Sequence, residues 1–252
     1  MCLTCPHMAV LPHEGTHSIM YGGWPLPIGS TQRTQYVARP DAAGRFPVVF
    51  VLPALGGLSG FEKDLCRMFA RWGVAAIGVD FYRGKGDPLE AYHHLSDGRA
   101  LTDLDEIHGF IVSDDVNWAV SGEIGILGID VGGRFGIIAA ATRPWVKAVA
   151  VAYTPLTGDE DRQYRVADHL DHLPVPVLGL YGTDDEFIDV ATVDEAQRRN
   201  DHGQWLLHEG AGHFFLDVEA DGYHADAAAD ARPRLVEFFK STLPAAVELD
   251  LG

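Results

Sequence analysis

The chain has little of the chemistry that marks secreted or membrane proteins. Only three of its 252 residues are cysteines, an odd number that gives no disulfide framework and is typical of a reducing compartment. No apolar run approaches the ~20 residues that a membrane helix needs. The first residues, M-C-L-T-C-P-H, lack the basic and apolar segments of a signal peptide. We therefore expect a cytoplasmic protein with no membrane partner.

Positive charge is also scarce, with 19 Lys and Arg against 36 Asp and Glu and a formal net charge of −17. Such a surface repels nucleic acid, so we expect no nucleic-acid partner and assign the charge to solubility. Pairs that resemble fragments of metal sites lie in the N-terminal tail or in polar stretches: Cys2/Cys5, His93/His94 and His169/His172. We expect no metal and no cofactor, a small-molecule substrate as the partner, and a monomer or homodimer.

Buried apolar runs alternate with segments of helical spacing along most of the chain. This alternation predicts a single α/β domain, with a mostly parallel sheet covered by helices on both faces. We expect the domain at residues 31–245, an irregular arm at 1–30 and a tail at 246–252. The predicted strands are Ser18–Tyr21, Thr34–Ala38, Phe46–Leu52, Val74–Val79, Glu123–Leu127, Val146–Ala152, Val175–Tyr181 and Gln204–His208. The predicted helices are Gly60–Trp72, Arg99–Val120, Val131–Thr142, Val190–Arg199 and Pro233–Ser241.

A strand, a tight turn and a helix follow one another at residues 123–141, E-I-G-I-L-G-I-D-V-G-G-R-F-G-I-I-A-A-A. The G-x-D-x-G turn is typical of the nucleophile elbow of an α/β-hydrolase, where the middle residue is normally Ser or Cys. Here that residue is Asp130. A carboxylate needs no base to remove its proton, but it is a poor reagent for acyl transfer.

Two further strands end in residues of catalytic type. Val175–Tyr181 is followed by G-T-D-D-E-F, which contains Asp185, and Gln204–His208 is followed by E-G-A-G-H-F-F, which contains His213 and Phe214. The carboxyl ends of parallel strands meet at one edge of a sheet. Each motif alone is weak evidence, but the order nucleophile, acid, histidine predicts a triad in which Asp185 orients His213 as the base. The short spacings leave little room for a lid domain.

Further motifs resemble the dienelactone hydrolases, a small lidless branch of the α/β-hydrolases. They are V-L-P-A-L-G-G-L-S at 51–59, V-A-A-I-G-V-D-F-Y-R at 74–83, G-T-D-D at 182–185, A-G-H-F-F at 211–215 and G-Y-H-A-D-A-A-A-D-A at 222–231. The resemblance covers about Phe46–Phe239. It implies that the family's cysteine falls on Asp130, its acid on Asp185 and its histidine on His213.

The same resemblance implies an oxyanion hole made of the backbone N–H groups of Leu55 and Val131. It places Arg83 near a position that the family uses to bind a substrate carboxylate, with an unremarkable surface arginine as the alternative. The family's glutamate in the oxyanion loop is replaced by Ala54. Loss of this second carboxylate is expected to keep Asp130 ionised, because like charges raise each other's pKa.

The aspartate narrows the expected reaction. Attack on an ester would form a mixed anhydride by expelling an alkoxide, which is the worse leaving group, so the adduct would revert. Attack on the saturated carbon of an epoxide or a halide gives an alkyl ester, which water activated by His213 then hydrolyses. Haloalkane dehalogenases and epoxide hydrolases are similar in having Asp at the elbow, although their H-G-x-P motif is absent here. Expected substrate contacts are Ala54, Tyr82, Arg83, Tyr153 and Phe214, with Tyr82 or Tyr153 as a candidate proton donor.

Two alternatives remain open at this stage. In the first, Asp130 and His213 act as a general base in the hydrolysis of a lactone or ester, or in a cyclisation. In the second, the chain is a retired hydrolase that binds a ligand or a partner. The presence of both Asp185 and His213 argues against retirement, because a binding protein has no evident need for that pair.

Overall fold

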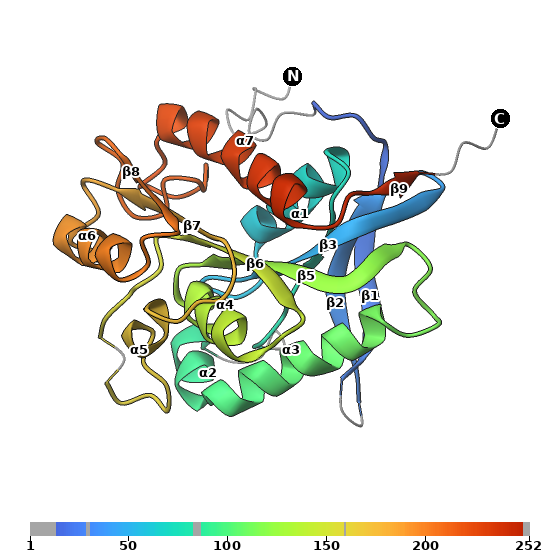
Figure 1. Cartoon of the computed structure of the whole chain (residues 1–252), viewed down its shortest axis with the longest axis horizontal. Helices are drawn as coiled ribbons and strands as arrows, with labels where there is room; N and C mark the ends of the chain where they lie inside the picture. The colour runs from blue at the N-terminus through green and yellow to red at the C-terminus, as the bar shows by residue number, and fades with distance from the viewer. Residues whose placement is uncertain (1–13, 29–30, 83–86, 159, 249–252) are drawn as a thin grey trace, which may run out of the picture.

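The computed structural model describes residues 14–28, 31–82, 87–158 and 160–248, which form one nine-stranded sheet with helices on both faces (Figure 1). Six strands run parallel in the order β4 (Ala75–Gly78), β3 (Gly44–Leu52), β5 (Ala119–Ile129), β6 (Val146–Ala152), β7 (Val177–Gly182) and β8 (Gln204–His208). An antiparallel hairpin, β1 (Ile19–Ile28) and β2 (Thr31–Pro40), extends the sheet beyond β4. The short β9 (Val247–Glu248) pairs with the start of β3.

The helices divide between the two faces of the sheet. On one face α1 (Gly60–Arg71) packs against α7 (Ala225–Thr242), with the rings of Phe69 and Phe239 5.6 Å apart. The other face is covered by α3 (Asp97–Ile111) and α4 (Val131–Thr142). The shorter helices are α2 (Pro88–His94), α5 (Ala167–Leu170) and α6 (Val190–Arg199). Because apolar side chains on both faces of the central strands are buried, this is the predicted single-domain α/β-hydrolase fold, and the fold prediction is confirmed.

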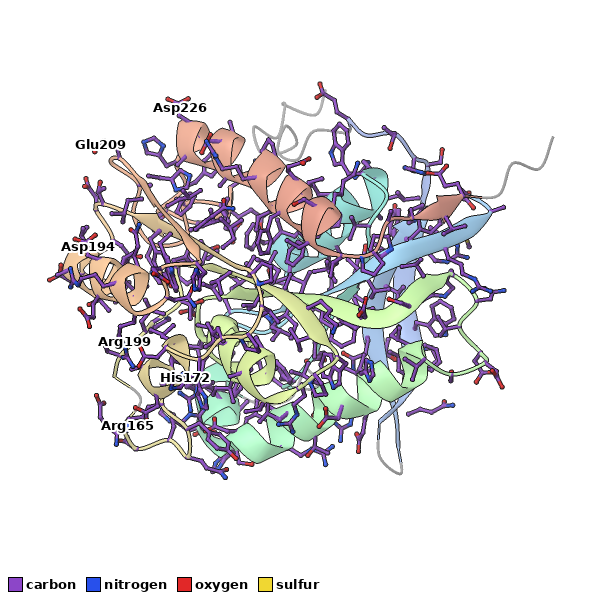
Figure 2. All side chains as sticks on the ribbon, in the orientation of Figure 1. Arg165, His172, Asp194, Arg199, Glu209 and Asp226 are labelled. Atoms are coloured by element: carbon purple, nitrogen blue, oxygen red, sulfur yellow. The ribbon has the colours of Figure 1, made fainter. Side chains whose placement is uncertain are left out.

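Charged side chains lie on the outer surfaces of the helices and loops. Figure 2 shows Arg165, Asp194, Glu209 and Asp226 at the periphery of the molecule. His172 is exposed and Arg199 pairs there with Asp171 across 2.8 Å. In the described part of the chain, no helix has the length and apolar character required to cross a membrane.

The strand predicted at Ser18–Tyr21 is present, but the predicted irregular arm is wrong beyond Tyr21. Strand β1 runs to Ile28 and pairs with β2 along its whole length. Pro25 and Pro27 favoured an irregular segment, but β1 is the edge strand of the sheet, where the missing N–H of a proline costs no ladder hydrogen bond. Part of the predicted tail, Val247–Glu248, is likewise a strand.

Two helix boundaries also differ from the prediction. Helix α3 ends at Ile111 instead of Val120. A turn follows the helix, in which the N–H and the Oγ of Ser113 donate to the Phe110 carbonyl at 3.0 and 2.7 Å. Strand β5 then starts at Ala119, well before the predicted Glu123. Helix α7 begins at Ala225 and not at Pro233, since its alanine-rich first turns favour helix strongly and carry the proline inside.

Candidate active site

The turn between β5 and α4 holds Asp130 in a backbone conformation that few residues adopt. Its φ is 50° and its ψ is −126°, outside the regions that a residue with a side chain normally populates. Glycines make the turn possible: a Cβ on Gly128 would lie 2.2 Å from the Cα of Gly133, and one on Gly132 would lie 2.4 Å from the carbonyl oxygen of Pro53. The carboxylate caps no N–H group of α4.

Each carboxylate oxygen of Asp130 has its own neighbour. The backbone N–H of Leu55 donates to Oδ2 across 3.1 Å. The other oxygen, Oδ1, lies 3.5 Å from Nε2 of His213. The predicted oxyanion-hole donor at Leu55 therefore binds the side chain of Asp130 itself.

The histidine turn and the acid turn meet at the same edge of the sheet. Nδ1 of His213 donates to Oδ2 of Asp185 across 2.8 Å. The other oxygen of Asp185 accepts the N–H groups of Phe187 and Ile188 at 2.9 and 3.1 Å, and its side chain is fully buried. Three residues predicted from separate motifs are thus brought together in the order Asp130, His213, Asp185, the geometry of a hydrolase triad.

The two carboxylates control the protonation of the histidine. Burial lowers the pKa of the His213 imidazole, but its contacts with Asp130 and Asp185 raise the pKa more, to about 9. At neutral pH the ring is therefore an imidazolium placed between two carboxylates.

A second carboxylate does approach the oxyanion loop, contrary to the expectation drawn from Ala54. The N–H of Ala54 donates to Oε1 of Glu62 at 3.2 Å, and the next N–H along the chain, that of Leu55, donates to Asp130. Glu62 also accepts the N–H of Ser59 at 2.8 Å, in a capping box that opens α1. The S-x-x-E pattern of this capping box was a signal from which the sequence could have located Glu62.

The other residues predicted for the site lie in different surroundings. Val131 is the first residue of α4. Ala54 and Phe214 line a cavity of about 260 Å³ together with Glu62 and Asp217. The hydroxyl oxygens of Tyr82 and Tyr153 are shielded from solvent and have no hydrogen-bond partner among the described residues. Arg83 lies outside the described residues.

Aromatic rings surround the imidazole of His213. The ring centroids of Tyr153, Phe187 and Phe214 lie 5.1, 5.1 and 4.4 Å away. Tyr153 is itself held at a positive φ of 39°, and burial raises its pKa so that the phenol stays neutral. Phe187 is 70% exposed and forms an apolar rim that the sequence pattern did not indicate.

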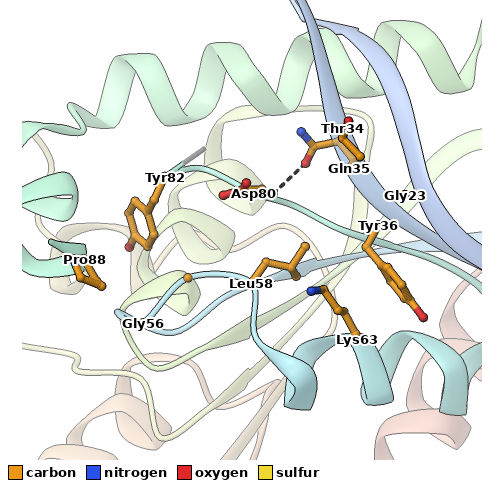
Figure 3. A pocket seen from close by; sticks show the side chains of 11 residues that line it. Gly23, Thr34, Gln35, Tyr36, Gly56, Leu58, Lys63, Asp80, Tyr82 and Pro88 are labelled. Carbon is orange, nitrogen blue, oxygen red and sulfur yellow. Dashed lines mark hydrogen bonds between the residues drawn. The ribbon is translucent and has the colours of Figure 1, made fainter. Parts of the chain in front are cut away.

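A larger cavity of about 600 Å³ lies on the other side of the oxyanion loop (Figure 3). Gly56 and Gly57 of the loop line it with Leu58, Lys63 and Tyr82. In its wall, the N–H of Asp80 donates to Oε1 of Gln35 at 2.7 Å. In the described ranges, His, Cys, Asp and Glu side chains form no cluster of three or more suited to a metal ion.

The fold and the arrangement of Asp130, His213 and Asp185 define an α/β-hydrolase. Residues 34–243 match the model of the dienelactone hydrolase family, and the chain belongs to this family. It is 30% identical over 260 residues to a Yersinia pestis protein named "Putative carboxymethylenebutenolidase", covering 94% of each chain. It is 28% identical to a Bradyrhizobium protein named "Probable 2-oxo-3-(5-oxofuran-2-ylidene)propanoate lactonase", covering 79% of this chain and 85% of the relative.

Solved structures agree with this family assignment. The crystal structure of a protein described as "Putative Dienelactone Hydrolase" from Klebsiella pneumoniae superposes with a TM-score of 0.79 at 29% identity. The match covers 88% of this chain and 99% of that one. The chain is therefore a hydrolase of the α/β-hydrolase superfamily.

Proposed function

We propose that this chain hydrolyses a small organic substrate by attack of Asp130 on a saturated carbon that carries an epoxide oxygen or a halide. The product of this first step is an alkyl ester of Asp130. Water activated by His213 then hydrolyses the ester and regenerates the carboxylate. Asp185 keeps the His213 ring in the orientation that both steps need.

One observation carries the proposal: the two oxygens of Asp130 occupy different places. Oδ2 accepts the N–H of Leu55, while Oδ1 faces His213. Oδ1 is then the oxygen that forms the bond to carbon. Oδ2 becomes the carbonyl oxygen of the ester and already lies where an oxyanion would be stabilised when water adds to Cγ.

Leaving-group chemistry supports the same reaction. A carboxylate that attacks an ester must expel an alkoxide, which is more basic than itself, so the mixed anhydride returns to the starting state. An epoxide oxygen is expelled with relief of ring strain, and a halide is a weak base. Both leave a stable alkyl ester that requires the second, water-consuming step.

The names of the relatives favour a second candidate, the hydrolysis of a lactone with Asp130 and His213 as a general base. The contact between Oδ1 and Nε2 is compatible with this role. However, the N–H of Leu55 is bound to Oδ2, so the carboxylate would first have to release it to the substrate carbonyl. For this reason we place the lactone reaction second.

Rapid-quench mass spectrometry under single-turnover conditions separates the two candidates. The purified enzyme is mixed with terminal epoxides, alkyl bromides and lactones, and peptides are searched for the mass of an added substrate. We expect an adduct on the peptide that contains Asp130, and none in Asp130→Asn. Asp184→Asn is the matched control, because this exposed carboxylate neighbours Asp185 without facing His213. Turnover of a lactone with no adduct would replace the proposal by the general-base reaction.

A further inference from the structure

One buried carboxylate joins the two ends of the oxyanion loop, the segment from Ala54 to Ser59. Glu62, on α1, is only 2% exposed. Its Oε1 accepts the N–H of Ala54 at 3.2 Å, where the loop begins. Its Oε2 accepts the N–H of Ser59 at 2.8 Å and the hydroxyl of Ser59 at 2.5 Å, where the loop ends. The loop is therefore closed across a single side chain.

The peptide unit between Pro53 and Ala54 is held from both sides. Its N–H, that of Ala54, points to Glu62. Its carbonyl oxygen, that of Pro53, lies against Gly132 of the elbow, where an added Cβ would come within 2.4 Å of it. Because a peptide unit is planar and its N–H and carbonyl point in opposite directions, these two contacts fix its orientation.

The next peptide unit contains the donor that faces Asp130. Its N–H, that of Leu55, donates to Oδ2 of Asp130 at 3.1 Å. Its carbonyl oxygen, that of Ala54, accepts the N–H of Gly57 at 2.9 Å. The two peptide units share only the Cα of Ala54, so two dihedral angles set their relative orientation. Release of the first unit from Glu62 would therefore allow the Leu55 N–H to turn away from Oδ2.

Resting on the nucleophilic role proposed for Asp130, we propose that Glu62 is a positioning residue for the Leu55 N–H. Among the described residues, the hydrogen bonds of Glu62 go to Ala54 and Ser59. It contacts neither Asp130 nor His213 in this way, so it acts on the reaction through the loop.

The Leu55 donor contributes unequally to the two half-reactions. When Asp130 attacks carbon, negative charge leaves its carboxylate, so an N–H bound to Oδ2 gives the transition state no advantage over the resting enzyme. When water loses a proton to His213 and adds to Cγ of the ester, negative charge builds up on Oδ2 and the N–H stabilises it. A misplaced donor should therefore slow hydrolysis of the ester much more than its formation.

Capping of α1 is the alternative role for Glu62. Ser59 is the N-cap residue, its Oγ accepts the N–H of Phe61 at 3.0 Å, and Glu62 completes a capping box through Oε2. Such a cap does not require the contact between Oε1 and Ala54. Ser59→Ala is therefore the matched control, because it removes the hydroxyl from the cap and keeps both backbone N–H groups that Glu62 binds.

The test compares Glu62→Gln, Glu62→Asp and Ser59→Ala with the wild type. Glutamine keeps the length of the side chain, but its NH₂ group cannot accept a hydrogen bond from an N–H group. Aspartate keeps the charge but is one methylene shorter, so it cannot span the loop. Rapid-quench mass spectrometry with styrene oxide and with benzyl bromide gives the rates at which the ester of Asp130 forms and decays. Thermal unfolding verifies that each variant is folded.

We expect decay of the ester to slow by roughly 10-fold to 10²-fold in both Glu62 variants, as for a misplaced donor. Formation of the ester should change by less than about threefold, because it does not depend on that donor. In Ser59→Ala both rates should match those of the wild type.

Hydrogen exchange of the Leu55 amide reports the position of the donor without any substrate. It is followed by NMR in enzyme labelled with ¹⁵N-leucine, with the peak assigned through Leu55→Ile. The hydrogen bond to Asp130 protects this amide. Exchange should therefore be roughly tenfold faster or more in the Glu62 variants and unchanged in Ser59→Ala.

Each other result has a definite meaning. Unchanged decay of the ester in folded Glu62→Gln would overturn the positioning role. Equal slowing in Ser59→Ala would assign the effect to the helix cap, and equal slowing of ester formation would show general damage to the site, so both would also overturn it. Absence of any ester of Asp130 in the wild type would instead refute the proposed function. Exchange of the Leu55 amide then decides the positioning role alone: faster exchange confined to the Glu62 variants supports it, and unchanged exchange overturns it.

Discussion

A buried ion pair joins Arg134 of α4 to Asp97, the first residue of α3. Nη2 of Arg134 donates to Oδ2 of Asp97 at 2.8 Å, and Nε lies 3.3 Å from Oδ1. The N–H of Tyr164 donates to the same carboxylate at 3.0 Å, and Nε of Arg162 lies 3.8 Å from it. The side chains of Asp97 and Arg134 are 1% and 3% exposed. Asp97→Ala would therefore leave cationic groups and an N–H without the carboxylate that they share.

The cost can be worked out from this burial. Removing one partner of a buried pair destabilises a protein by about 3–5 kcal/mol, mostly because the other charge stays buried and uncompensated. Unfolding entropy of about 2.1 cal/mol/K per residue gives roughly 0.5 kcal/mol/K for a chain of this length. We therefore expect the Tm of Asp97→Ala to fall by about 6–10 °C.

Thermal and urea unfolding measure this loss, with two matched variants. Adding Arg134→Met to Asp97→Ala removes the uncompensated charge and should recover part of the stability. Asp171→Ala breaks the exposed pair with Arg199 and should leave the Tm almost unchanged. A loss of less than about 1 kcal/mol for Asp97→Ala would refute the reasoning, because a buried group would then have been replaced at no more than the cost of an average substitution.

Three further predictions concern the oxyanion loop, the elbow and the histidine. Leu55→Pro removes the N–H that binds Oδ2 of Asp130. Hydrolysis of the alkyl ester of Asp130 should therefore slow by roughly 10²–10³-fold in single-turnover kinetics. An unchanged rate would argue against this donor. Gly128→Ala places a Cβ 2.2 Å from the Cα of Gly133, so urea unfolding should show a large loss of stability, and a neutral result would contradict the close packing of the elbow. The pKa of His213 is raised from 6.5 to about 9, so its stabilising contribution is complete below pH 6.5 and is lost as pH rises to about 9. The difference in unfolding free energy between wild type and His213→Gln should shrink over that interval, and a constant difference would exclude the linkage.

Much of the fold could be predicted because its central elements are marked by strong local patterns. The ranges Val131–Thr142, Val146–Ala152, Val190–Arg199 and Gln204–His208 agree with the structure at both ends. Val131–Thr142 and Val190–Arg199 are helices bounded by turn residues, Val146–Ala152 is a buried apolar run, and Gln204–His208 is a short strand whose Trp205 and His208 are buried. The pattern failed where tertiary structure overrides it: β1 is a strand because it pairs with β2, although Pro25 and Pro27 oppose a strand locally.

The candidate site could also be predicted only in part. Asp130, Asp185 and His213 follow buried strands in hydrolase order, and parallel strands bring their ends together, so their proximity follows from topology. Loop conformation decides which oxygen of Asp130 accepts the N–H of Leu55. It also decides that Glu62 accepts the N–H of Ala54. The shielding of the Tyr82 hydroxyl depends on packing by residues distant in sequence. Neither the spacing nor the composition of the motifs contains that information.

Heavy-oxygen labelling tests the central claim most directly. One turnover of the wild type in water enriched in oxygen-18, with an epoxide as substrate, is followed by peptide mass spectrometry of Asp130. If Asp130 forms an ester that water attacks at Cγ, one heavy oxygen appears in its carboxylate and the first equivalent of diol carries none from solvent. If the diol carries the heavy oxygen and Asp130 stays unlabelled, water attacks the substrate directly and the nucleophilic role of Asp130 is contradicted.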